Sequence, residues 1–200
     1  MKKIAIIGTG RMGGAFATAF AKRTPHGFDP RIAWGSSSAA ALSHQLGMQV
    51  ADDEELLAAD VAFVATPPAA LDDVAAARKV TPALSFRRWC ARGYQLKRDD
   101  GTSTAEQLAR LVPKGCVVTA FTSISSGLIR DPASGEKAHG VYLRERQGRA
   151  LDRDRLEEIG FKGVDAGHLD ASRNVENLSL LVGQLAYGSG FGNRVSCAPM

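Results

Sequence analysis

A glycine-rich turn directly after an apolar run at the start of the chain constrains the fold more than any other feature. The run Ile4 to Ile7 predicts a short buried strand. Residues 8–13 follow as Gly-Thr-Gly-Arg-Met-Gly, a GxGxxG pattern, and then an alanine- and phenylalanine-rich stretch predicts a helix through about Arg23. A strand, a tight turn and a helix are therefore expected in this order.

The spacing of the three glycines indicates a dinucleotide-binding turn. Gly8 permits the tight turn, Gly10 lets a pyrophosphate approach the backbone, and Gly13 allows the helix to pack closely on the sheet. The phosphates would meet free amide groups and the positive dipole end of the helix. A glycine turn without a ligand is the alternative interpretation.

Strands and helices alternate along most of the chain, which favours a mostly parallel sheet with helices on both faces. Residues 24–30, with two prolines, predict a connection, and 86–101 predict a basic loop. We expect one Rossmann-like, doubly wound α/β domain over residues 1–200, with a C-terminal helix over 172–187 at the substrate site or at a dimer interface. The further predicted strands are 31–35, 48–50, 61–65, 80–84, 116–122, 141–144 and 161–165, and the further predicted helices are 39–46, 71–79, 103–111 and 152–159, with an acidic helix start at 52–55.

Composition argues against several other classes of protein. The net charge is only +4, and the basic cluster within residues 87–98 accompanies no nucleic-acid-binding motif. No apolar run approaches the roughly 20 residues of a membrane helix. Cys90, Cys116 and Cys197 have neither disulfide nor metal-site spacing. We therefore expect a cytoplasmic protein without a metal, a nucleic-acid partner or a membrane partner.

The end of the second predicted strand indicates which dinucleotide is preferred. An acidic residue there would bind the ribose 2′-hydroxyl and repel a 2′-phosphate, but this chain has Gly35 followed by Ser36, Ser37 and Ser38. Three hydroxyl groups at a helix start suit a phosphate, and Arg11 could reach the same side from the glycine turn. NADP(H) is therefore favoured over NAD(H), while a purely helix-capping role of the serines is the alternative.

The substrate is expected at the carboxyl ends of the parallel strands. This rule places Thr66, Pro67 and Pro68 and the segments 81–85 and 122–126 around the nicotinamide. No nucleophile elbow, zinc-protease motif or glycosidase-type carboxylate pair is present, so hydrolysis has little support.

With these motifs the chain resembles the F420-dependent NADP oxidoreductase family. Its members are small Rossmann enzymes that pass hydride between NADPH and the deazaflavin coenzyme F420. The family reads Gly-Ser-Arg where this chain has Gly35-Ser36-Ser37, so a bidentate phosphate clamp is missing here. The likeness rests on Ile4–Gly13, Gly35–Ser37, Ala65-Thr66-Pro67-Pro68, and Gly163–Leu178 with its Asp165-Ala166-Gly167, Ser172-Arg173 and Glu176.

The resemblance implies specific roles for residues in these motifs. The Thr66–Pro67 turn would flank the nicotinamide, and the basic loop would hold the anionic tail of F420 or lie in solvent. The residues implied to contact the phosphates of NADP are Thr9, Arg11, Met12, Ser36 and Ser37.

The expected activity is hydride transfer between NADP(H) and F420 in a homodimer. The first alternative is reduction of a small C=N, C=C or C=O substrate, which needs a proton donor near the ring. Candidate donors are His168, Asp165, Asp170 and Tyr187, of which His168 would be tested first. An NADP-binding regulatory protein without turnover is an alternative of another class.

Overall fold

A computed structural model gives the fold and describes residues 2–22, 28–33, 37–77, 83–85, 101–113, 117–131, 139–144 and 162–192. Several predicted features lie outside these residues. They are Ser36, most of the basic loop, the helix at 152–159 and the three cysteines.

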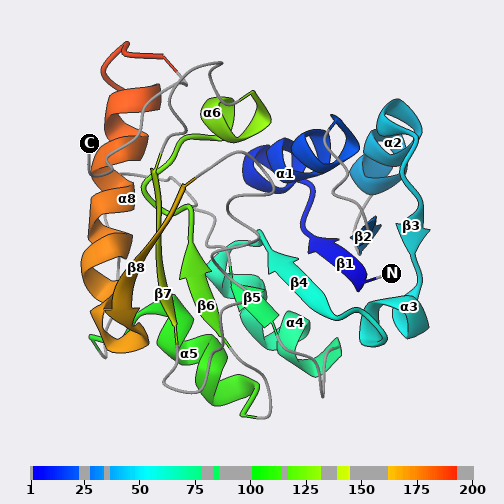
Figure 1. The fold of residues 1–200 in the computed structure, drawn as a ribbon, viewed down its shortest axis with the longest axis horizontal. Coiled ribbons are helices and arrows are strands. Elements are labelled where there is room, and N and C mark those ends of the chain that lie inside the picture. Colours follow the sequence, from blue (N-terminus) through cyan, green and yellow to red (C-terminus); the bar gives the residue numbers. More distant parts are fainter. Residues whose placement is uncertain are drawn as a thin grey trace.

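One eight-stranded sheet forms the centre of the molecule, in the order β3-β2-β1-β4-β5-β6-β7-β8 (Figure 1). Neighbouring strands are parallel except β6 and β7, which are antiparallel. The first six strands have the order of a doubly wound dinucleotide-binding sheet, so the predicted Rossmann-like fold is confirmed. The strands are β1 (Lys2–Ile7), β2 (Phe28–Ala33), β3 (Val50–Ala51), β4 (Val61–Val64), β5 (Ala83–Ser85), β6 (Val118–Ala120), β7 (His139–Arg144) and β8 (Lys162–His168).

Helices cover both faces of this sheet because the central strands are apolar on both sides. In β1, Ile4 and Ile6 belong to one buried cluster, while Ala5 and Ile7 belong to a second. The first cluster includes residues of α1 and α6, and the second includes residues of α4 and α5. The helices are α1 (Arg11–Lys22), α2 (Ser37–Leu46), α3 (Asp53–Leu57), α4 (Leu71–Ala77), α5 (Thr104–Leu111), α6 (Ser126–Arg130) and α8 (Ser172–Tyr187), with short 3₁₀ turns η1 (Pro68–Ala70) and η2 (Leu169–Ala171).

Local capping signals set where two helices begin. Asp52 caps α3 and Ser103 caps α5, and each forms a capping box with a glutamate three residues later. Helix α8 begins and ends at the predicted residues, Ser172 and Tyr187. It stands along one side of the molecule, with α5 near its lower end and α6 near its upper end (Figure 1).

Strand β2 begins three residues earlier than predicted, so the assignment of Phe28 to Pro30 to a connection is wrong. The N–H of Ile32 donates toward the β3 side, to Gln49 O at 3.0 Å. The nitrogen of Pro30, two residues earlier, faces the same way. Because β3 pairs only with Ile32 and Ala33, the missing N–H of Pro30 breaks no ladder bond.

Two further differences concern the second half of the chain. The sequence did not predict α6, a short helix directly after β6. Strand β8 runs on to His168, beyond the predicted end at Asp165. Among the described residues, no helix is long and apolar enough to span a membrane.

Candidate functional site

The turn between β1 and α1 leaves no room for side chains at two of its glycines. Gly8 has a φ of 96°, and a Cβ there would lie 2.8 Å from the carbonyl oxygen of Ala65. A Cβ on Gly13 would lie 1.7 Å from the carbonyl oxygen of Gly8. The helix start is thus packed against the turn, and the turn against the end of β4, in a way that only glycine permits.

Helix α1 directs its first amide groups toward this turn. The N–H of Gly14 donates to the carbonyl of Gly10 at 2.8 Å. The backbone N–H groups of Arg11, Met12 and Gly13 precede this first helical hydrogen bond. No carbonyl group of the helix lies far enough before them to accept their hydrogen bonds. Together with the helix dipole, these amides can bind the pyrophosphate of a dinucleotide.

The serines expected near a 2′-phosphate lie at the start of the second helix. Ser37 and Ser38 form the first turn of α2, directly after β2 along the chain. Ser36 lies outside the described residues. The backbone of α2 therefore begins where the sequence predicts a site for the adenosine ribose.

Arg11 points to a different place from the one expected. Its guanidinium carbon lies 4.8 Å from the ring centroid of Tyr187, the last residue of α8. The hydroxyl of Tyr187 is 2.9 Å from Oγ of Ser126, the first residue of α6. In this conformation Arg11 is turned toward α6 and α8 and not toward the serines at α2. The contact joins the C-terminal helix to the glycine turn, which the sequence did not predict.

The carboxyl ends of β4 and β6 carry buried hydroxyl groups. Thr66 follows β4, and Thr122 and Ser123 follow β6. The hydroxyl oxygens of all three are buried without a hydrogen-bond partner, as is that of Thr119 within β6. Pro67 lies next to Thr66, and its carbonyl accepts the N–H of Ala70 at 3.0 Å where η1 begins.

His168 lies away from the glycine turn. In the sheet register, His168 of β8 pairs with Arg144 of β7. Arg144 in turn pairs with Val118, the first residue of β6. Because β7 and β8 run opposite to the central strands, His168 lies at their amino edge, whereas the glycine turn is at their carboxyl edge. His168 Nδ1 is 3.3 Å from an Asp170 carboxylate oxygen, and both side chains are well exposed.

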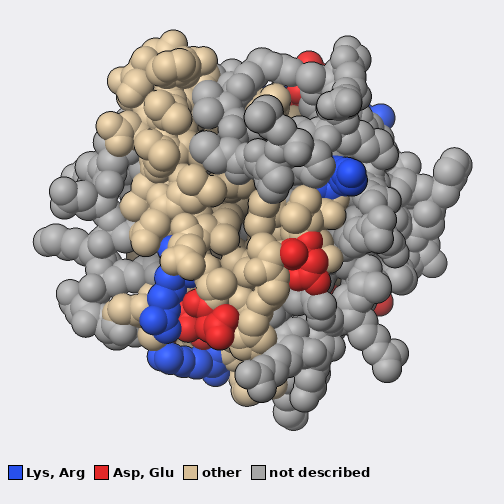
Figure 2. Space-filling view, turned by 60° about the vertical axis from the view of Figure 1, so that its left-hand side comes forward, with Lys and Arg blue, Asp and Glu red and all other residues tan. Residues whose placement is uncertain are grey.

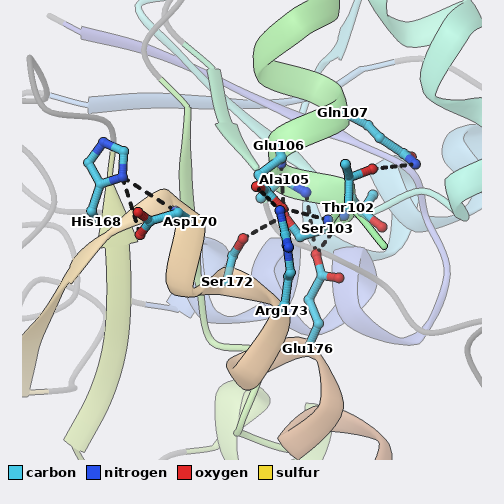
Figure 3. Close-up of polar contacts among 11 residues, drawn as sticks. Thr102, Ser103, Ala105, Glu106, Gln107, His168, Asp170, Ser172, Arg173 and Glu176 are labelled. Carbon is cyan, nitrogen blue, oxygen red and sulfur yellow. Dashed lines mark hydrogen bonds and ion pairs between the residues drawn. The ribbon is translucent and has the colours of Figure 1, made fainter. Parts of the chain in front are cut away.

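Tyr187 therefore lies apart from the other three candidate proton donors, which belong to β8 and to η2 directly after it. Asp165 is exposed, and its carboxylate accepts the N–H of Gly167 at 2.9 Å. Asp170 is exposed beside His168 (Figure 3). Tyr187, in contrast, contacts Arg11, a residue of the glycine turn.

The motif Ser172-Arg173 and Glu176 attaches α8 to the start of α5 (Figure 3). Glu176 is fully buried, and its carboxylate accepts the backbone N–H of Thr104 at 2.9 Å and of Ala105 at 3.3 Å. The hydroxyl of Ser172 donates to that of Ser103. These residues belong to the Gly163–Leu178 segment of the family resemblance, and in the structure they hold α8 on α5.

A bidentate ion pair lies beside this junction. Arg173 contacts both carboxylate oxygens of Glu106, at 2.9 and 2.8 Å. The hydrogen bonds from Arg173 lower the pKa of Glu106 to about 2, because they favour the charged carboxylate; burial works in the opposite direction. Glu106 also completes the capping box of α5, so the pair ties α8 to the same helix start.

Above this junction the exposed surface of α8 is uncharged. Glu176 is the only charged residue between positions 174 and 192, and it is buried. Figure 2, with the side of α8 turned forward, shows a group of charged side chains at the lower left of this face and an uncharged area above that group, at the upper left. Leu181, Tyr187 and Phe191 are exposed there.

With this geometry described, the chain can be compared with known proteins. Residues 3–84 match the family of coenzyme F420-dependent NADP oxidoreductases. This match confirms the family resemblance over the glycine turn and the first five strands. The family is one of NADP-dependent oxidoreductases, as the resemblance implies. The motif at Gly163–Leu178 lies outside the matched range. No curated protein sequence matches the chain.

Solved structures share the fold at low sequence identity. A hypothetical protein, SMa0349 from Sinorhizobium meliloti, has a TM-score of 0.75 at 21% identity, with 100% of this chain and 97% of that chain covered. A candidate F420-dependent NADP reductase from Arthrobacter sp. FB24 has a TM-score of 0.77 at 19% identity, with 100% of both chains covered.

A longer relative shares the same fold. The reductive aminase from Aspergillus terreus, solved with NADPH4, cyclohexanone and allyl amine, has a TM-score of 0.68 at 20% identity. The match covers 96% of this chain but 63% of the aminase. At these identities the likeness concerns the fold alone.

Proposed function

We propose that the protein is an oxidoreductase that binds NADP(H) at the β1–α1 turn and transfers hydride between NADP(H) and coenzyme F420. The observation that carries this proposal is the closely packed glycine turn at the start of α1, in a chain whose residues 3–84 match the F420-dependent family. When bound, NADP(H) supplies or accepts the hydride, and the protein binds and orients the two partners.

The residues around the turn fit such a dinucleotide. The amides of Arg11, Met12 and Gly13, with Thr9 in the turn before them, would bind the pyrophosphate. Ser36, Ser37 and Ser38 would surround a 2′-phosphate, because no acidic residue stands between positions 33 and 38. Thr66 and Pro67 would flank the nicotinamide at the end of β4.

Absorbance of F420 tests this function directly. Purified protein is mixed with oxidised F420 and NADPH, and the deazaflavin band is followed with NADH in a parallel sample. Rapid bleaching with NADPH alone supports both the activity and the phosphate preference. Binding of NADPH without turnover of F420 or of any other acceptor would indicate an NADP-binding regulatory protein instead.

Reduction of a small C=N, C=C or C=O substrate is a second candidate function, and one specific observation favours it. Such a reaction adds hydride to carbon and a proton to the other atom of the double bond. Tyr187 offers a hydroxyl group beside Arg11 and Ser126, at the end of the molecule where the glycine turn lies. We therefore assign the proton-donor role in this candidate to Tyr187, because His168 lies at the opposite edge of the sheet.

We also propose that the protein is a cytoplasmic homodimer that associates through the upper part of α8. The exposed side chains of Leu181 and Phe191 and the absence of exposed charge between 174 and 192 support this interface. Light scattering on the native protein and on Leu181→Lys tests it. The wild type should have the mass of two chains and the variant that of one, whereas a monomeric wild type would contradict the dimer.

A further inference from the structure

The guanidinium group of Arg11 lies over the face of an aromatic ring. Arg11 is the first residue of α1, and its guanidinium carbon is 4.8 Å from the ring centroid of Tyr187. The negative face of the ring attracts the cation, but the ring has no net charge that would neutralise it. The N–H groups of Arg11 therefore stay available for an anion.

In the part of the chain that the structure describes, no carboxylate forms an ion pair with Arg11. The arginines of β2 and α8 differ from it in this respect. Arg31 is paired with Asp29 at 2.9 Å. Arg173 is paired with Glu106 at 2.8 Å. The side chain of Arg11 is exposed, and its charge is not neutralised by any of the described residues.

The ring of Tyr187 is fixed at both of its ends. Its backbone belongs to the last turn of α8, where Val182 and Ala186 are buried. Its hydroxyl is 2.9 Å from Oγ of Ser126, which is buried at the start of α6. Helix α6 packs against α1, the helix that Arg11 begins. The ring therefore has a defined position relative to the start of α1.

We propose that Tyr187 is a positioning residue that holds Arg11 where its guanidinium binds the diphosphate bridge of the dinucleotide. The inference rests on the proposed function, in which the backbone N–H groups of Arg11, Met12 and Gly13 bind this bridge. The cation and these N–H groups belong to the same helical turn, so both act on an anion bound there. A long side chain loses conformational entropy when it binds a ligand, and the ring reduces this loss because it orders Arg11 beforehand.

This role of Arg11 increases affinity without selecting between NADP(H) and NAD(H), because both contain the diphosphate bridge. The contact with Tyr187 turns Arg11 away from Ser37 and Ser38 at the start of α2, where a 2′-phosphate would lie. The charge of Arg11 therefore acts on the bridge and not on the 2′-phosphate. Any selection between the two dinucleotides then depends on the start of α2.

Calorimetric titration of Tyr187→Leu, Arg11→Ala and the double variant tests this role. Both side chains are exposed, so neither replacement leaves a buried cavity. The affinity for NADPH should fall about tenfold or more in Arg11→Ala, the size of a lost hydrogen bond between charged groups. It should fall about threefold in Tyr187→Leu, the size of an exposed cation–π contact. The double variant should bind NADPH as Arg11→Ala does, because Tyr187 acts through Arg11.

Two fragments of the dinucleotide show which part of it Arg11 contacts. Adenosine diphosphoribose 2′-phosphate has the diphosphate bridge but no nicotinamide, and its affinity should fall by the same factors as that of NADPH. Adenosine 2′-monophosphate has no bridge, and its affinity should be the same in all variants and in the wild type.

Two control variants separate this role from general effects of the substitutions. Tyr187→Phe keeps the ring and should bind NADPH with the wild-type affinity. Arg110→Ala removes the same charge from an exposed residue in the last turn of α5. Helix α5 lies near the lower end of α8, whereas Tyr187 is at the upper end (Figure 1). This variant should also keep the wild-type affinity.

Three results would overturn the inference while leaving the proposed function intact. They are an NADPH affinity of Tyr187→Leu equal to that of the wild type, losses that add up in the double variant, and an equal loss for adenosine 2′-monophosphate. A wild-type protein that does not bind NADPH would instead overturn the proposed function and the inference together.

Discussion

The buried carboxylate of Glu176 accepts the backbone N–H of Thr104 at 2.9 Å and thereby joins α8 to the first turn of α5, 72 residues earlier in the chain. A carboxylate at this position also interacts favourably with the positive end of the α5 dipole. The other end of α8 carries Tyr187, which contacts Arg11 and Ser126. The junction at Glu176 therefore helps to determine where the far end of α8 meets the glycine turn.

Replacement of Glu176 should destabilise the fold strongly. Glu176→Ala removes the acceptor of two backbone amides and leaves a cavity, so we expect the free energy of unfolding to fall by about 3 kcal/mol. Glu176→Gln keeps an acceptor oxygen but loses the charge and should cost about 1 to 2 kcal/mol. Urea denaturation measures both. A loss below about 0.5 kcal/mol for Glu176→Ala would show that the junction does not hold α8.

The Arg173–Glu106 pair should make stability depend on pH in the acid range. The pKa of Glu106 is lowered from 4.5 to about 2 in the folded protein, so its stabilisation is complete above pH 4.5 and disappears as the pH falls toward 2. Because Arg173 is half exposed, we expect the pair to contribute less than about 1 kcal/mol.

The comparison of wild type with Arg173→Gln isolates this contribution. The difference between their urea midpoints should be largest at neutral pH and should shrink between pH 4.5 and pH 2. A difference that stays constant over this range would mean that the two charges are not coupled.

Gly13 and Gly14 offer a matched pair of substitutions in α1. Gly13→Ala would place a Cβ 1.7 Å from the carbonyl oxygen of Gly8, so the turn must open and NADPH affinity should fall by at least tenfold. Gly14→Ala would meet only atoms at 3.8 and 3.9 Å and should stabilise the helix by up to about 1 kcal/mol. Calorimetric titration with NADPH measures the affinities. Equal binding by both variants would argue against a dinucleotide at this turn.

Tyr187→Phe tests whether a small acceptor receives its proton from the C-terminal helix. The variant keeps the ring under Arg11 and loses the hydroxyl that contacts Ser126. We expect kcat for reduction of a C=N or C=O substrate to fall about 100-fold or more, with unchanged NADPH affinity. His168→Ala, at the opposite sheet edge, should keep its kcat. An unaltered kcat in Tyr187→Phe would remove Tyr187 from the reaction.

The sequence alone determined those strands and helices that form because of interactions between neighbouring residues in the chain. The apolar run before the glycines predicted β1, and the turn could form only with glycine at positions 8 and 13. Carboxylate and hydroxyl caps marked the starts of α3 and α5, and both ends of α8 were predicted correctly. Steric fit, capping and burial periodicity each involve neighbouring residues, so they can be recognised in a linear sequence. The alternation of these elements was enough to predict the parallel sheet.

Only the tertiary structure decided which distant residues meet. The reversal of direction at β7 carried His168 to the amino edge of the central strands, although its position after a strand made it a plausible site residue. The same reversal let α8 run from Glu176 beside α5 up to Tyr187 beside Arg11. The sequence contained no sign of these contacts, because strand direction depends on pairing between segments far apart in the chain.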